Sequence, residues 1–419
     1  MPAFLDLRHL EKTQRVTLGA AVILTAAAGA STAAGAGNVA RFVVAGLALA
    51  ALAALVGQAI EQVSERLGPG PTALVQSTLG NVPELFVALF ALRDGLTGVV
   101  RAALVGSILG NVLLVLGCSF VAGGLRHGTQ RFDPEEPRLN ASLLLLVVAA
   151  LLVPTLADRL GTPAAAHISA LSNVCAIVLL VVYAASIPFY LRRRLAVAAD
   201  PAADQATGPP AGPAPGDGGA IYPPNRVHDR TNVSGGPARE GGPAPETPPA
   251  PEREPAPDRE TGRAPSPWPL SLSIGLLVVG SLGAALASDL FVDPLQPAVR
   301  SLGLSQTFTG LVVVAIASNS VENAVGIRFA LKAKPEYVIS TTLNSPLQVA
   351  LFLTPVLVLL SRVVGPTQLT LVFPPLLVAA LAASALVVAV VIYDGEYTWI
   401  EGVALIALYL IIAAAFWWG

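Results

Sequence analysis

The sequence predicts an all-α polytopic membrane protein with about 11 transmembrane helices. Hydrophobic residues make up 54% of its 419 residues and charged residues only 12%, with a mean hydropathy of +0.67. Soluble domains carry about 25% charged residues. Apolar stretches of roughly 20 residues, the length needed to cross a bilayer, recur along the chain. One short polar motif also lies inside such a stretch in each half.

The order of apolar stretches predicts two five-helix repeats preceded by one N-terminal helix. The linker between the repeats is rich in Pro, Gly and Ala and carries too little apolar surface to fold by itself. The predicted segments are 1–38 (N-terminal segment and first helix), 39–191 (first repeat), 192–269 (disordered linker) and 270–419 (second repeat). The candidate spans are 17–36, 40–63, 71–93, 97–123, 139–157, 164–191, 270–289, 304–331, 335–361, 369–392 and 398–418.

Basic residues near the ends of the spans predict the orientation of the chain. With the N-terminus in the cytoplasm, Lys and Arg favour the cytoplasmic side by about two to one, and the linker is cytoplasmic as well. Five spans is an odd number, so the second repeat enters the membrane in the opposite sense to the first. Inverted repeats with binding groups near the midplane are typical of secondary transporters.

The repeated polar motif is the main functional signal. It reads Gly80-Asn81-Val82-Pro83-Glu84 in the first half and Ser318-Asn319-Ser320-Val321-Glu322 in the second. Each places an amide and a carboxylate three residues apart, hence on one face of a helix. An ionisable group in hydrocarbon costs several kcal/mol unless it has a partner or water. A matched pair, one in each half, therefore indicates an ion site.

The residue types in the motif suit a hard cation. Carboxylate oxygens favour Ca²⁺, Mg²⁺ or Na⁺ over soft metals, so Glu84 and Glu322 are the expected metal ligands. Crowded carboxylates repel each other, and protons then compete with the metal for the same oxygens. Asn81 and Asn319 offer amide oxygens on the same faces, although small and amide residues also serve simply to pack helices closely.

Further polar residues around the motifs are candidates for a supporting role. Glu61 and Asp289 stand near the end of the span before each motif, where they either form a vestibule for cations or are solvated at the interface. Gly80 and Ser318 weaken local helical bonding and free backbone carbonyls. Asn111 and Gln348 lie inside apolar runs, where bonding between helices explains them as well as ligation does.

These motifs resemble the calcium/cation antiporter superfamily, most closely its cation/proton (H⁺/Ca²⁺) exchanger branch. The resemblance covers both alpha repeats, from about Glu61 to Gly124 and from about Ser288 to Leu360, and includes a Gly-Ser-Ile-Leu-x-Asn run at 106–111. It implies that Glu84 and Glu322 are the principal cation carboxylates and that Ser345 and Gln348 line the site. It also implies eleven spans, no resident cofactor, and Ca²⁺ and H⁺ as transported substrates.

The chain also departs from the pattern of that branch. Asn323 stands where the branch usually has histidine beside the second glutamate, so a proton-handling imidazole is missing. Pro83 before Glu84 is more similar to the sodium/calcium exchanger branch. These departures leave the counter-ion, the stoichiometry and the choice among Ca²⁺, Na⁺, K⁺ and Mn²⁺ open.

The sequence thus predicts a secondary transporter that exchanges a cation, expected to be Ca²⁺, for H⁺ by alternating access. The alternatives are a Na⁺-driven Ca²⁺ exchanger or a monovalent cation/proton antiporter on the same scaffold, and a channel or structural membrane protein whose acids are only paired. No nucleophile–base pair or nucleotide motif suggests an enzyme. The expected partners are inorganic cations, protons and the lipid bilayer, without nucleic acid; homo-oligomerisation stays open. The Arg- and Ala-rich composition is typical of a GC-rich genome and favours a bacterial inner membrane.

Overall fold

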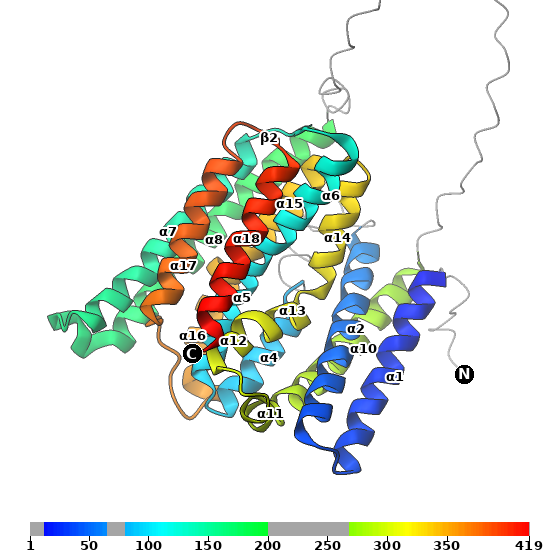
Figure 1. Cartoon of the computed structure of the whole chain (residues 1–419), viewed down its shortest axis with the longest axis vertical. Helices are drawn as coiled ribbons and strands as arrows, with labels where there is room; N and C mark the ends of the chain where they lie inside the picture. Colours follow the sequence, from blue (N-terminus) through cyan, green and yellow to red (C-terminus); the bar gives the residue numbers. More distant parts are fainter. Residues whose placement is uncertain (1–11, 65–79, 200–267, 419) are drawn as a thin grey trace, which may run out of the picture. The chain divides into compact units, whose positions relative to one another are not determined.

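The computed structural model describes residues 12–64, 80–199 and 268–418 (Figure 1). Inside these ranges the side chains of residues 64, 189–199 and 320–324 are not described. The first half forms the elements α1 (Lys12–Ala33), α2 (Asn38–Ser64), α4 (Val82–Arg93), α5 (Thr97–Leu109), η3 (Gly110–Val115), α6 (Leu116–His127), β1 (Gln130–Arg131), α7 (Glu135–Arg159), η4 (Pro163–His167) and α8 (Ile168–Ala199).

The second half consists mostly of helices and contains one short strand. Its elements are α10 (Leu270–Val292), α11 (Leu295–Leu302), α12 (Gln306–Phe308), η5 (Thr309–Val314), α13 (Ala315–Ser318), α14 (Ser320–Leu331), α15 (Pro335–Gln348), η6 (Val349–Leu353), α16 (Thr354–Val364), α17 (Pro375–Val391), β2 (Glu396–Tyr397) and α18 (Trp399–Trp417). β1 and β2 pair antiparallel, so this short ribbon joins the two halves of the chain.

The helices of the two halves repeat with a constant spacing. α14 begins and ends 238 residues after α4, since Val82 corresponds to Ser320 and Arg93 to Leu331. α15 begins 238 residues after α5, at Pro335 against Thr97, and a π-helical turn follows each of them (η3 and η6). π-Helical turns inside α-helices are frequent at functional sites. The backbone thus repeats most closely around the two polar motifs.

Eight helices of the described residues are long and apolar enough to cross a membrane, or up to nine if a bent pair counts as one span. The bent pair joins α11 to the segment 306–318 at an angle of 120°. The predicted span 71–93 lies partly outside the described residues. The predicted span 369–392 shrinks to the 17-residue helix α17, because Pro374 and Pro375 start the helix late. At the linker, α8 continues to Ala199, eight residues beyond the predicted end.

The segment before α17 is extended and buried instead of helical. Leu369, Leu371 and Phe373 are each at most 2% exposed, an alternation typical of extended chain. Their backbone N–H groups donate hydrogen bonds to hydroxyl oxygens. Leu369 donates to Ser361 at 2.9 Å, Leu371 to Ser172 at 3.0 Å and Phe373 to Thr155 at 3.2 Å. Buried backbone groups need such partners, so these hydroxyls allow the non-helical chain to lie among helices.

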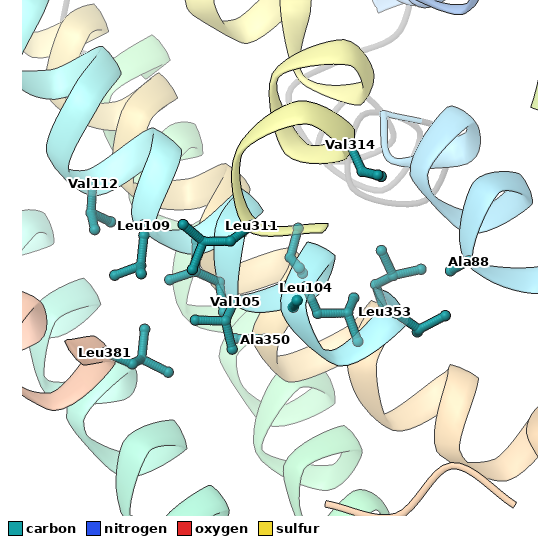
Figure 2. Packing of buried hydrophobic residues seen from close by; sticks show 14 of the residues in the cluster. Ala88, Leu104, Val105, Leu109, Val112, Leu311, Val314, Ala350, Leu353 and Leu381 are labelled. Carbon is teal, nitrogen blue, oxygen red and sulfur yellow. The ribbon is translucent and has the colours of Figure 1, made fainter. Parts of the chain in front are cut away.

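α5 and η5 cross closely at the centre of the bundle. Figure 2 shows Leu104, Leu109 and Leu311 in the apolar packing around this crossing. Glycine is required on both sides: a Cβ at Gly106 would overlap the backbone of Leu311, and a Cβ at Gly310 would lie 2.6 Å from the carbonyl oxygen of Val99. Since α5 belongs to the first half and η5 to the second, this crossing brings the two motifs together.

α1, α2 and α10 lie side by side, and α10 also packs against α4 (Figure 1). Trp268 lies two residues before the start of α10 and is 1% exposed. Its indole N–H donates to Gln14 at 3.0 Å and its backbone N–H to Gln62 at 2.9 Å. The start of the second half is thereby fixed to the beginning of α1 and the end of α2.

Candidate cation site

The first polar motif lies at the start of helix α4, and the second lies at a break between helices α13 and α14. Asn81 precedes α4 with φ −95° and ψ 17°, and Asn319 separates α13 from α14 with nearly the same angles, φ −98° and ψ 18°. Neither asparagine side chain caps the helix that follows it. Each amide is therefore available for bonds to other parts of the fold.

Glu84 lies in the first turn of α4 and is 8% exposed. Its Oε1 accepts a hydrogen bond of 2.7 Å from the hydroxyl of Ser107 on α5. Its Oε2 is buried and has no hydrogen-bond partner among the described residues. A buried carboxylate with one free oxygen is costly without a counter-charge, so the position favours either a proton or a bound cation.

Ser107 joins the two motifs directly. While its hydroxyl donates to Glu84, its oxygen accepts a bond of 2.8 Å from the amide of Asn319. The three side chains come from α4, α5 and the α13–α14 break, and all are buried. Ser107 is not among the site residues predicted from the sequence. The signal was present, because Ser107 stands 238 residues before Ser345, which was selected from the resemblance.

A second bond also crosses between the halves. The amide of Asn81 donates to Gln348 Oε1 at 3.2 Å, and Asn81 is 5% exposed. Gln348 ends α15 immediately before the π-helical turn η6. Each asparagine of the repeated motif is thus bonded to a residue of the opposite half.

Three buried oxygens around these bonds have no partner among the described residues: Glu84 Oε2, Asn111 Oδ1 and Ser345 Oγ. Asn111 uses its amide N–H to bond the carbonyl of Ser107 at 3.1 Å, which leaves its oxygen unpaired. An unsatisfied buried polar group costs about 1–3 kcal/mol. Oxygen atoms of carboxylate, amide and hydroxyl groups are ligands of hard cations. The unpaired set therefore fits a cation better than an anion.

A pocket runs from Glu84 along one face of α4 and one face of α5. Its polar lining is limited to Glu84, Ser107 and Ser318, and the other walls are apolar. Ser318 is 7% exposed and donates its hydroxyl to the carbonyl of Val314 at 3.0 Å. The apolar lining residues are Val87, Ala88, Ala91, Val99, Val100, Ala103, Leu104, Leu295 and Val314. Such low-dielectric walls strengthen the field of the carboxylate.

Other predicted residues lie away from this cluster or outside the described side chains. Glu61 is exposed near the end of α2. The carboxylate of Asp289 is 42% exposed and forms an ion pair of 2.7 Å with Arg93. Gly80 lies in the turn before α4. Glu322 and Asn323 belong to α14, but their side chains are outside the described residues.

No group of three His, Cys, Asp or Glu side chains that could hold a metal ion occurs among the described residues. A cation at this place would therefore be bound by carboxylate together with amide and hydroxyl oxygens. That mixture of oxygen ligands is typical of Ca²⁺ and of hard monovalent cations.

Comparison with known proteins identifies the family. Residues 37–191 and 272–418 match the profile of the family described as sodium/calcium exchanger protein. The chain belongs to this family. Membership in an exchanger family, expected from the motifs, is thus confirmed, and it is a family of transporters, not enzymes.

Relatives in this family cover nearly the whole chain. A Ca²⁺/H⁺ antiporter of Synechocystis sp. is 34% identical over 90% of both chains. The Ca²⁺/H⁺ antiporter ChaA of Bacillus subtilis is 32% identical over 87% of this chain and 88% of its own. The solved structure of native YfkE is 27% identical, with a TM-score of 0.69 over 95% of this chain and 99% of that chain. The protein is therefore an all-helical, multi-pass integral membrane protein.

Proposed function

We propose that this protein exchanges Ca²⁺ for H⁺ across a membrane by alternating access. The observation that carries the proposal is the buried Asn319–Ser107–Glu84 chain, which joins both repeated motifs around a carboxylate oxygen that has no hydrogen-bond partner among the described side chains. Relatives at 34% and 32% identity, named Ca²⁺/H⁺ antiporters, support the choice of substrates.

In the proposed mechanism the same oxygens hold either the metal ion or protons. Glu84, with Glu322 from the second motif, supplies the charge, while Asn81, Asn319, Ser345, Gln348 and Asn111 supply neutral oxygens. Ser107 orients Glu84 by donating to Oε1, which leaves Oε2 for the substrate. A divalent cation and protons compete for these carboxylates, so release of one substrate permits binding of the other. Exchange follows when the loaded site is exposed alternately to the two sides.

We further propose that eleven spans cross the membrane, arranged as two inverted five-helix repeats after one N-terminal helix. The repeats occupy 39–191 and 270–419, and the linker between them is cytoplasmic, as is the N-terminus. The excess of basic residues on that side supports this orientation. A bacterial inner membrane is the proposed location, in agreement with the bacterial relatives.

Transport in everted membrane vesicles tests the function. With an acidic lumen, we expect radioactive Ca²⁺ to accumulate in vesicles that contain the protein and not in vesicles that lack it. Collapse of the pH gradient with a protonophore should stop the accumulation. Uptake driven equally well by an imposed Na⁺ gradient at constant pH would instead favour a Na⁺-driven exchanger, the candidate favoured by Pro83 and by Asn323 in place of histidine. Uptake without coupling to either gradient would contradict exchange.

A further inference from the structure

Arg93, the last residue of the helix that carries Glu84, lies between two carboxylates. Its Nη2 is 2.7 Å from Asp289 Oδ1 at the end of α10, and its Nε is 3.2 Å from Oδ1 of the neighbouring Asp94. The guanidinium also lies over the ring of Phe90, 4.9 Å from its centroid. The Arg93 guanidinium thus contacts two carboxylates and one aromatic ring.

This charge lies at the end of α4 toward which the pocket runs. From Glu84, the pocket follows α4 to Ala91, two residues before Arg93. The pocket is also lined by Leu295, the first residue of α11. Leu295 follows the end of α10, and Asp289 lies in the last turn of α10. Arg93 lies nine positions after Glu84, which corresponds to about 13 Å along a helix. Arg93 and Asp289 do not line the pocket, but they lie at the ends of α4 and α10 beside it, so their charges act through space on a cation that enters from this end.

A second ion pair neutralises another carboxylate close in sequence to the first. Arg41, in the first turn of α2, is paired with Asp293, which directly follows α10. Asp94, Asp289 and Asp293 are thus each paired with an arginine. Without these arginines, three acidic side chains at the ends of α4 and α10 would attract cations.

We propose that Arg93 is a tethered counter-ion that sets the apparent affinity of the protein for cations arriving at the pocket from this end. The inference rests on the proposed function, because it concerns access to the same site. By pairing with Asp289 and Asp94, the guanidinium cancels their attraction for an incoming divalent cation. It leaves the binding oxygens of Glu84 unchanged. Arg93 is thus a residue that tunes entry and does not itself bind the substrate.

The expected size of the effect follows from exposure. The side chains of Arg93 and Asp289 are 51% and 42% exposed, so solvent weakens their field. Exposed charge pairs at such sites change equilibria roughly two- to five-fold. Replacing Arg93 by glutamine should therefore lower the half-saturating Ca²⁺ concentration by about that factor. Since salt screens exposed charges over about 10 Å at 0.1 M, the difference should shrink as ionic strength rises.

The experiment measures the initial rate of Ca²⁺ transport against Ca²⁺ concentration in vesicles of both orientations, at low and high salt. Arg93→Gln should lower the half-saturating Ca²⁺ concentration and leave the maximal rate unchanged. The change should appear only when Ca²⁺ is added on one side, which is the outer side in the proposed topology. Arg93→Lys keeps the charge and should resemble the wild type. Asp289→Asn should change half-saturation in the opposite direction. Arg131→Gln is a matched control, because Arg131 forms a comparable exposed ion pair of 2.9 Å with Glu396 on the β1–β2 ribbon.

The outcomes separate the inference from the proposed function. If the wild type exchanges Ca²⁺ but Arg93→Gln leaves the half-saturating Ca²⁺ concentration unchanged, the role of Arg93 is refuted while the proposed function stands. The same holds if Arg93→Lys behaves as Arg93→Gln does, since packing and not charge would then be responsible. If the wild type fails to exchange Ca²⁺ at all, the proposed function falls, and the inference falls with it. A charge-dependent, salt-sensitive, one-sided change would support both.

Discussion

The two halves of the candidate site have the same backbone but bond differently. In the first half, Ser107 holds Glu84 and accepts from Asn319 of the second half. In the second half, the equivalent Ser345 has no partner among the described residues, and Gln348 accepts the bond from Asn81. The repeat therefore fixes where side chains stand, while the residue types decide which of them bond.

The two halves also differ in the residue before each serine, which is Gly106 in the first half and Asn344 in the second. Gly106 faces the backbone of Leu311 so closely that no side chain fits. At the equivalent place Asn344 has a side chain, and it turns toward α7, where its oxygen accepts from Asn140 at 2.9 Å and its amide donates to Glu136 at 3.2 Å. The first half is thus adapted to a close helix crossing, and the second to a polar contact with α7.

Replacing each carboxylate in turn is the strongest test of this comparison. We expect Glu84→Gln and Glu322→Gln each to reduce exchange to the background of vesicles lacking the protein, because one of the two charges for a divalent ion is lost. Uptake is measured at equal amounts of folded protein, judged by gel filtration, with Glu396→Gln as the control. Normal exchange by either variant would show that only one half carries the chemistry.

Filling the space at Gly106 should have the next largest effect. Gly106→Ala places a methyl group against the backbone of Leu311, so α5 and η5 must move apart. Overpacking of this kind costs about 1–3 kcal/mol, and it also separates Ser107 from Asn319. We expect a lower Tm in detergent and the loss of most transport. Gly275→Ala, in a helix position with open space around it, is the control and should be harmless. An unchanged Tm for Gly106→Ala would contradict the close crossing.

The two serines allow the halves to be compared directly. Ser107→Ala removes a bond to a charged group, worth about 1.5–3 kcal/mol, and should weaken the apparent affinity for Ca²⁺ by roughly ten- to 100-fold. Ser345→Ala removes no bond among the described residues and should have a smaller effect. Saturation curves of Ca²⁺ uptake measure both. A larger loss in Ser345→Ala would mean that the second half, not the first, orients the site.

The neutral bond between Asn81 and Gln348 should give the smallest effect. Bonds between neutral groups contribute about 0.5–1.5 kcal/mol. A double-mutant cycle of Asn81→Ala and Gln348→Ala, followed by thermal unfolding, should therefore show coupling of about that size. The corresponding cycle of Asn319→Ala and Ser107→Ala is the comparison. Additive effects in the first cycle would indicate that the 3.2 Å contact contributes nothing.

Sequence reasoning found the helical class and the duplicated motif, but it predicted continuous spans through both copies of the motif. The predicted span 304–331 is in fact interrupted at Asn319, inside the polar motif. It did not find the extended segment around Leu369 and Leu371, because apolar residues in a buried strand-like segment look like the start of a span. The hydroxyls that bond this segment come from Ser361, Ser172 and Thr155, two of them from distant helices.

The sequence alone determined the membrane class and the duplicated motif, because hydropathy and the spacing of residues on a helix are local properties. The family followed from the resemblance of the motifs and from the family match. Only the tertiary structure decided that Ser107 joins Glu84 to Asn319 and that Asp289 is paired with Arg93. The Ser107–Asn319 and Arg93–Asp289 contacts link residues about 200 positions apart. They depend on how closely helices approach, which is set by glycines such as Gly106 and by packing that no local pattern records.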